Sequence, residues 1–178
     1  MRKLKKVSDS ILNSKGVQMK KQILALLTFA GFALGNVALA HGADDHATDL
    51  QFAKPEAAVK YCEGVFTVMA AHFGKLGAMA SGKAPFDAKS AAANADLVAN
   101  LAHLPWGGFG KETAAIKSEA KPEVWSSPAK FKELAEKLEM TTDKLATVAK
   151  AGNENDFKAA FKDVAGTCKA CHTDYKQK

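Results

Sequence analysis

The last helical segment of this 178-residue chain contains a short run of two cysteines and a histidine, Cys168, Cys171 and His172. Two thiols at the C-x-x-C spacing can add to the two vinyl groups of a haem as thioethers, and the adjacent histidine can reach the iron from the same side. Three side chains within five residues then fix a porphyrin's position, tilt and proximal ligand. The motif predicts one covalent haem c, and the remainder of the chain can be interpreted by asking whether it fits that group.

Two other sites use C-x-x-C. A thioredoxin-like dithiol opens a helix after a strand of a βαβ unit, whereas this pair ends an alanine-rich helical pattern with no strand before it. A structural zinc site needs a second pair of ligands at close spacing, and the remaining cysteine, Cys62, lies over a hundred residues upstream. Haem attachment is therefore the favoured interpretation.

The first 40 residues have the pattern of an export leader. Lys20 and Lys21 precede an apolar run over 23–34 that is too short for a membrane span, and Ala-Leu-Ala ends at Ala40. Cleavage there predicts a leader at 1–40 and one mature domain at 41–178, exported to the periplasm, where c-type haem is attached. Met19 is an alternative start, and an uncleaved anchor is the alternative to a cleaved leader.

The basic charge of the chain belongs to the leader. Residues 1–40 hold seven of the 25 Lys and Arg and one of the 19 Asp and Glu, so residues 41–178 hold 18 of each. A mature domain without net charge gives no support for nucleic-acid binding or for a basic membrane patch.

Apolar residues recur at steps of three or four through the mature domain, and no stretch alternates as a strand does. The pattern predicts an all-α, antiparallel four-helix bundle with one long crossover loop over residues 105–126. In the loop, Trp106, Phe109 and Trp125 either cover a haem edge or plug the end of the bundle. The expected helix boundaries are Pro55 for the first helix, Asp87 and Pro105 for the second, Ser127-Pro128 and Gly152 for the third, and Asn153 or Asn155 for the start of the fourth.

The position of the motif limits the sixth iron ligand. Only six residues follow His172, and none is methionine, so a sixth ligand must come from upstream or be absent. Without one, the iron stays open to a small molecule. Met69, His72 and His103 are the upstream candidates; we expect the two histidines to serve the helix surface or core instead.

At this point the chain resembles a known family, the cytochromes c-prime or class II cytochromes c. The resemblance spans nearly the whole mature domain and rests on residues 51–61, 69–74, 104–110, 121–125, 166–172 and 175–176.

The resemblance implies a periplasmic four-helix bundle, frequently a homodimer through its first two helices. It implies high-spin, five-coordinate haem iron that binds nitric oxide and carbon monoxide but discriminates against dioxygen. His172 matches the proximal ligand, Cys168 and Cys171 match the thioether positions, and Phe66 matches the distal residue. Lys176 matches a basic residue, commonly arginine, near the proximal face.

The chain departs from the family pattern at Cys62, where arginine commonly holds a haem propionate. The resemblance then implies that Lys60, Glu63, Glu119 or Lys121 rearranges around the propionates. Cys62 itself is expected to pack in the helix, with an intersubunit disulfide as the alternative. Lys176 in place of arginine is a less rigid proximal partner.

Three functions compete. The first is gas binding at an open haem, with electron transfer to a redox partner protein as a further role. The second is a low-spin electron carrier with Met69 as the sixth ligand. An enzyme is the third, and it is disfavoured because no convincing distal acid–base pair is present.

Overall fold

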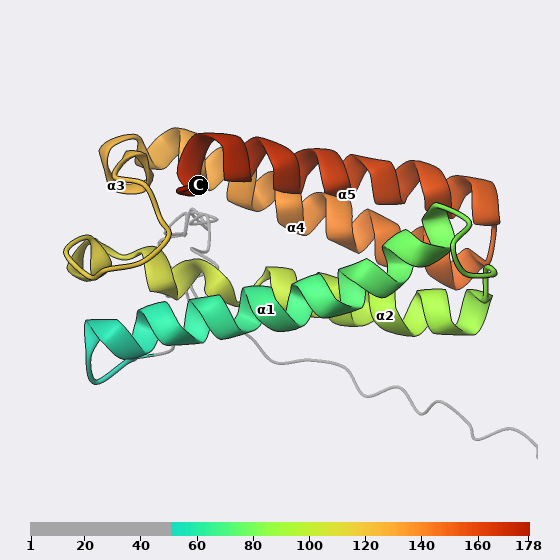
Figure 1. The fold of residues 1–178 in the computed structure, drawn as a ribbon, viewed down its shortest axis with the longest axis horizontal. Helices are drawn as coiled ribbons and strands as arrows, with labels where there is room; N and C mark the ends of the chain where they lie inside the picture. Colours follow the sequence, from blue (N-terminus) through green and yellow to red (C-terminus); the bar gives the residue numbers. More distant parts are fainter. Residues whose placement is uncertain (1–50) are drawn as a thin grey trace, which may run out of the picture. The chain divides into compact units, whose positions relative to one another are not determined.

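A computed structural model of the chain describes residues 51–178. Four long helices form the bundle, and the long connection between the second and third of them contains three short helical turns (Figure 1). The expected all-α four-helix bundle is confirmed. The elements are α1 (Pro55–Ala80), α2 (Ala88–Ala102), η2 (Pro105–Phe109), η3 (Lys111–Thr113), α3 (Glu123–Ser126), α4 (Pro128–Ala151) and α5 (Glu154–Tyr175).

The helix ends follow the expected signals at most positions. Asp87 caps α2 by accepting a hydrogen bond from the backbone N–H of Ser90, and Asn153 caps α5 by accepting from the N–H groups of residues 155 and 156. Gly152 ends α4 with a φ of 76°, which a residue with a side chain rarely adopts. The expectation that the side chain of Ser127 caps α4 is wrong. This side chain makes no capping hydrogen bond, and Pro128 alone favours the start of the helix.

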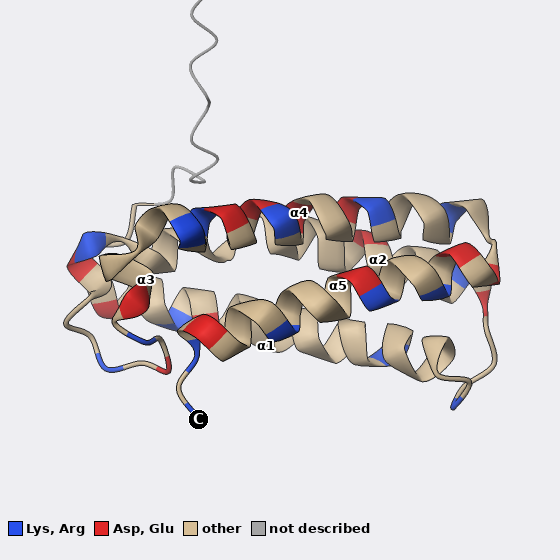
Figure 2. Cartoon of the chain, turned by 90° about the horizontal axis from the view of Figure 1, so that it is seen from above, with Lys and Arg blue, Asp and Glu red and all other residues tan. Residues whose placement is uncertain are grey.

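The core fills the half of the bundle away from the chain's C-terminus. Leu76, Val98, Leu145 and Phe157 are fully buried there, one from each long helix. The alanines of α2 let α1 and α4 each pack close to α2, because a methyl side chain takes up little space between two helix axes. Acidic and basic residues alternate along the outer face of α4, away from this core (Figure 2).

The long connection is tied to the segment that ends α5. The backbone N–H of Lys121 donates to the carbonyl of Tyr175 at 2.9 Å, and that of Gln177 donates to the carbonyl of Glu119 at 2.8 Å. Trp125 Nε1 donates to the carbonyl of Gly110 at 3.0 Å, within the connection. These bonds fix the connection beside the haem-attachment motif.

The predicted leader at 1–40 and the start of the mature domain lie outside the described residues, so both stay predictions. Between residues 51 and 178, no helix has the length and apolar character needed to cross a membrane.

Candidate haem site

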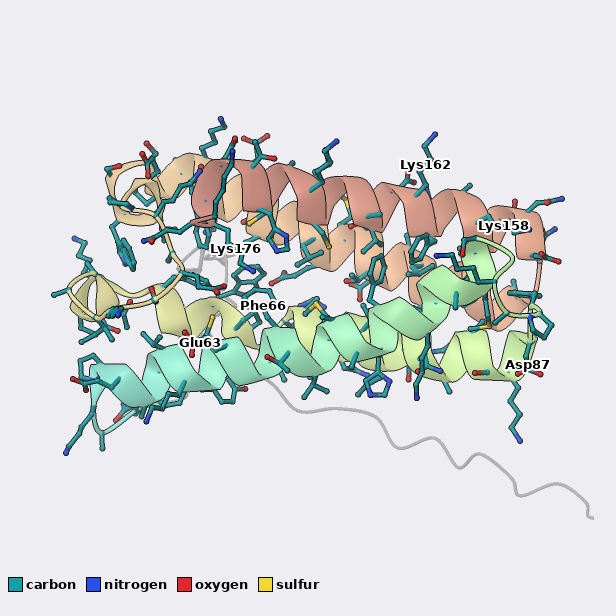
Figure 3. The ribbon with its side chains drawn as sticks, viewed as in Figure 1. Glu63, Phe66, Asp87, Lys158, Lys162 and Lys176 are labelled. Carbon is teal, nitrogen blue, oxygen red and sulfur yellow. The ribbon has the colours of Figure 1, made fainter. Side chains whose placement is uncertain are left out.

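A cavity of about 690 Å³ lies between α1, the long connection, α4 and the last turns of α5. Its volume falls within the ~300–1,000 Å³ of ordinary ligand pockets, and most of its wall is apolar or aromatic. All three motif residues, Cys168, Cys171 and His172, are part of the wall. Figure 3 shows Phe66 directed from α1 into the space below α5, with Lys176 at the end of α5 above it.

The motif occupies the last two turns of α5, and its spacing explains why all three side chains meet one cavity. Positions i, i+3 and i+4 share one face of a helix. Val164 and Thr167, one turn earlier, are buried, whereas Cys168 and Cys171 are partly buried and His172 is exposed. The apolar stripe of α5 thus passes from the packed core into the cavity wall.

The environment of the two thiols disfavours dithiol redox chemistry. Burial raises the pKa of Cys168, and burial, assisted by the charge of Cys168, raises the pKa of Cys171 to about 11. Reactive dithiols need the opposite, a lowered pKa at a helix N-terminus. Within residues 51–178, no three His, Cys, Asp or Glu side chains gather as ligands for a metal ion.

His172 is suited to metal ligation. Partial burial of the imidazole lowers its pKa, the charge of Lys176 lowers it further, and the charge of Glu119 opposes them. The neutral imidazole, which is the form that binds metals, is favoured as a result.

Lys176 and Glu119 lie beside this histidine as an ion pair with Nζ and Oε2 3.1 Å apart. Lys121 Nζ donates to the carbonyl of Thr173 at 2.8 Å, on the following turn. A second and more open hollow, here called the outer hollow, shares Cys168 and His172 with the cavity wall. Four lysines line that hollow, and no acidic residue does: Lys121, Lys169, Lys176 and Lys178.

The wall contributed by α1 is apolar at its centre. Phe66 and Met69 both line the cavity, and Met69 is 6% exposed. Phe66 contacts the ring of Trp106 edge to face with centroids 6.2 Å apart, and that of Phe109 with centroids 6.5 Å apart. Trp106, Phe109 and Trp125 all line the cavity, so the structure favours the first of their two expected roles, covering a haem edge.

Cys62 is buried on α1 beneath Gly108 of η2. Burial is the main cause that raises its pKa to about 12, and the neighbouring charge of Glu63 adds to it. A buried thiol under a backbone segment fits the expected packing role and disfavours the intersubunit disulfide. Cys62, Glu63 and Glu119 line the cavity, and Lys121 lines the outer hollow; Lys60 lines neither.

The two histidines considered as sixth ligands point to other partners. His72 Nδ1 lies 2.8 Å from Oδ1 of Asn94 on α2. His103 lies 3.4 Å from Glu139 and 3.5 Å from Asp143, both on α4. Neither histidine lines the cavity, which leaves Met69 as the upstream rival.

Several wall residues were not predicted as part of a site. Phe131, Leu134 and Leu138 belong to the apolar stripe of the third long helix, and Tyr175 ends the stripe of the fourth. The helical stripe was the only signal for them, and a stripe does not distinguish a core from a cavity wall. Glu139, which accepts a hydrogen bond from Trp106 Nε1, had no signal in the sequence.

The residues of the cavity fit a covalent haem. The apolar wall can receive a porphyrin, the paired cysteines stand at the thioether spacing, and a neutral histidine follows directly.

The comparisons with known proteins agree. The model of the family described as cytochrome C′ matches residues 57–176. The cytochrome c′ of Alcaligenes xylosoxydans xylosoxydans is 43% identical over 128 residues, covering 72% of this chain and 99% of that protein. The cytochrome c′ of Rubrivivax gelatinosus is 47% identical over 129 residues, covering 72% of this chain and 100% of that protein.

Solved structures show the same fold. The crystal structure of Rubrivivax gelatinosus cytochrome c′ superposes with a TM-score of 0.69 at 47% identity, covering 71% of this chain and 100% of its own. A ferrous variant of Alcaligenes xylosoxidans cytochrome c prime with bound NO superposes with a TM-score of 0.68 at 43% identity, covering 72% of this chain and 99% of its own. The chain therefore belongs to the cytochrome c′ family, whose members are haem proteins with a covalent c-type haem.

Proposed function

We propose that this chain is a periplasmic haem protein that binds nitric oxide and carbon monoxide at five-coordinate, high-spin iron. One observation carries the proposal: the wall that α1 presents to the cavity is centred on the phenyl ring of Phe66, across from the motif on α5. A phenyl ring cannot bind iron, so the coordination position on that side would remain available to a small molecule.

In this proposal Cys168 and Cys171 attach the haem, and His172 binds the iron from the α5 side. The haem supplies an iron that binds diatomic gases. The protein holds the haem at one wall of the cavity, and the rings of Phe66, Trp106 and Phe109 exclude water from the other.

The apolar wall also explains selectivity among gases. Bound dioxygen carries partial negative charge and gains from a distal hydrogen-bond donor, whereas nitric oxide depends on one far less. Phe66 offers no donor, and the indole N–H of Trp106 is already donated to Glu139. The related Alcaligenes xylosoxidans protein with bound NO is a further support for nitric oxide as the ligand.

Met69 supports a second candidate, a low-spin electron carrier. Its side chain is buried in the same cavity, one turn from Phe66, and thioether sulfur is an established axial ligand of haem iron. The ferric and ferrous visible spectra of the exported protein distinguish the two. High-spin spectra that change on addition of nitric oxide are expected; a low-spin spectrum with a sulfur-to-iron charge-transfer band would contradict the proposal.

The lysines around the outer hollow favour a redox partner protein with an acidic face. Residues 41–178 have no net charge, so Lys121, Lys169 and Lys178 form a local positive surface rather than part of a basic protein, whereas Lys176 is paired with Glu119. Reduction by an anionic flavin should therefore slow with rising salt more than reduction by a neutral flavin. Equal salt dependence for the two flavins would contradict this assignment.

Location and assembly complete the proposal. A leader at 1–40 implies that the periplasmic protein begins at His41, which mass spectrometry of the fractionated protein can test. The resemblance implies a homodimer through α1 and α2, and Val68 on α1 and Leu97 on α2 are exposed apolar residues at 46% and 37%. We propose a binding role without catalytic turnover.

A further inference from the structure

Glu139 of α4 is connected to the distal residue Phe66 through Trp106: the carboxylate accepts a hydrogen bond from the indole, and the indole packs against the phenyl ring. The Glu139 side chain is only 13% exposed, although it belongs to a helix whose other acidic side chains mostly face solvent. Oε1 accepts the hydrogen bond of Trp106 Nε1, and Oε2 lies 3.4 Å from His103 Nδ1. A carboxylate on a mostly buried side chain needs polar partners, and the hydrogen bond from Trp106 fixes Oε1 while His103 lies within reach of Oε2.

His103 contacts a second carboxylate on the same helix. It is the residue at which α2 ends, and its second nitrogen, Nε2, lies 3.5 Å from Oδ1 of Asp143, one turn along α4 from Glu139. Glu139 therefore joins the end of α2, the η2 turn and α4 at a single point.

The indole of Trp106 extends this linkage to α1. Its ring meets Phe66 of α1 with centroids 6.2 Å apart at an interplanar angle of 75°, and Phe131 of α4 with centroids 6.1 Å apart at 79°. The indole of Trp106 thus lies between α1 and α4, in contact with the ring of Phe66 on one side and that of Phe131 on the other. Edge-to-face contacts of this kind restrict the rotation of both rings.

The geometry points to Glu139 as a positioning residue for the distal wall: by holding the indole of Trp106, it keeps the ring of Phe66 over the position where a gas would bind. Glu139 touches no ligand and acts through Trp106. The inference rests on the proposed function, in which Phe66 crowds the distal position. Without the carboxylate the indole can rotate, Phe66 loses its edge contact, and the distal space widens.

The sequence offers matched variants. Glu139→Leu keeps a similar volume and removes both acceptors, whereas Glu139→Gln retains an acceptor for the indole. Glu136→Leu is the control, because Glu136 lies one turn away on α4 with its side chain 63% exposed and paired with Lys132. Trp106→Phe removes the N–H donor and keeps an aromatic ring.

The first measurement is the carbon monoxide association rate of the ferrous holoprotein by stopped flow. We expect Glu139→Leu to raise the rate about threefold or more, which is the size of effect that couplings through packed side chains produce. Glu139→Gln should stay near the wild-type rate, and Glu136→Leu should leave it unchanged. In the Trp106→Phe background, Glu139→Leu should add little, because the route through the indole N–H is already broken.

The second measurement separates this inference from the proposed function. The chain has two tryptophans, and Trp125 Nε1 donates to the carbonyl of Gly110, so the indole N–H resonance of Trp125 is an internal reference. In NMR spectra of the ferrous carbon monoxide complex, which is diamagnetic, Glu139→Leu should shift the Trp106 indole resonance and leave that of Trp125 unchanged. A six-coordinate wild-type protein would overturn the gas-binding proposal. The NMR spectrum would still test whether Glu139 holds the indole of Trp106.

Two results would overturn the inference. One is a Trp106 indole resonance that Glu139→Leu does not move. The other is a carbon monoxide rate that Glu139→Leu leaves unchanged, or raises by the same factor with and without the Trp106 indole. If Glu139→Leu does not fold, Glu139→Gln with a wild-type rate and an altered rate for Trp106→Phe would support the role, and an unaltered rate for Trp106→Phe would refute it.

Discussion

Gly108 of η2 lies directly against Cys62 of α1: a β-carbon on Gly108 would stand 2.4 Å from the Cβ of Cys62 and 3.0 Å from the carbonyl oxygen of Ala58. The glycine lets the backbone of the long connection rest on the first helix. Because Trp106 and Phe109 belong to the same turn, this contact fixes the depth at which their rings enter the cavity.

Gly108→Ala should therefore destabilise the protein by about 1–3 kcal/mol, the usual cost of forcing extra volume into a packed contact. Gly107→Ala is the matched control, since a β-carbon there would meet only Phe52 at an ordinary 3.8 Å. Urea unfolding of the two variants gives the comparison. Equal midpoints would show that η2 does not rest on Cys62 as described.

Cys62 should give the stability of the protein a measurable pH dependence. Burial raises its pKa from 9.0 to about 12, so the folded state holds a proton that the unfolded state loses above pH 9. The stability gained from this thiol is complete below pH 9 and is lost as the pH rises toward 12, by a few kcal/mol in all. Unfolding at several pH values above 9 should show a steeper decline for wild type than for Cys62→Ala. Parallel curves would contradict the buried-thiol assignment.

Cys168 and Cys171 should retain the haem under denaturing conditions. The wild-type protein, separated on a denaturing gel, should keep its haem stain and resist extraction by acidified organic solvent, because thioether bonds survive unfolding. The double variant Cys168→Ala, Cys171→Ala should lose the stain, whereas Cys62→Ala should keep it. Pigment that washes out of the wild-type protein would refute covalent attachment.

Phe66 should set the rate at which carbon monoxide reaches the iron. Phe66→Ala removes the ring from the cavity wall and should speed association roughly tenfold, equivalent to about 1.4 kcal/mol of barrier. Val68→Ala, on the same helix but 46% exposed, should have no effect. Stopped-flow mixing measures both, and an unchanged rate for Phe66→Ala would remove Phe66 from the distal position.

Val68 should mark the subunit interface if the bundle pairs through its first two helices. A charge introduced by Val68→Asp would be buried in that interface and should shift the protein to monomer in sedimentation experiments. Met140→Asp places the same charge on α4, where the side chain is 65% exposed, and should leave the assembly unchanged. A monomeric wild type, or the reverse response of the two variants, would contradict the pairing.

The helices were predictable because their signals are local. The caps at Asp87 and Asn153, the left-handed Gly152 and the apolar steps along α1 each depend on residues within a few positions. Ser127 shows the limit of such signals, since a serine before a proline has the right composition and makes no cap.

The site was predictable only where a motif is continuous in sequence. Cys168, Cys171 and His172 lie within one helical turn of one another, and the structure places them on the cavity wall. The contacts of Glu139 with Trp106 and of Cys62 with Gly108 join residues 33 and 46 positions apart. Such pairs depend on how the helices pack, which no local pattern encodes.

The pairing of the long connection with the segment after α5 has a consequence for local unfolding. The N–H of Lys121 donates to the carbonyl of Tyr175, and the N–H of Gln177 donates to the carbonyl of Glu119. These two hydrogen bonds join residues more than 50 positions apart, so the connection and the last turn of α5 support each other. Hydrogen exchange should therefore report one shared opening for both segments, because neither can separate without breaking the same bonds.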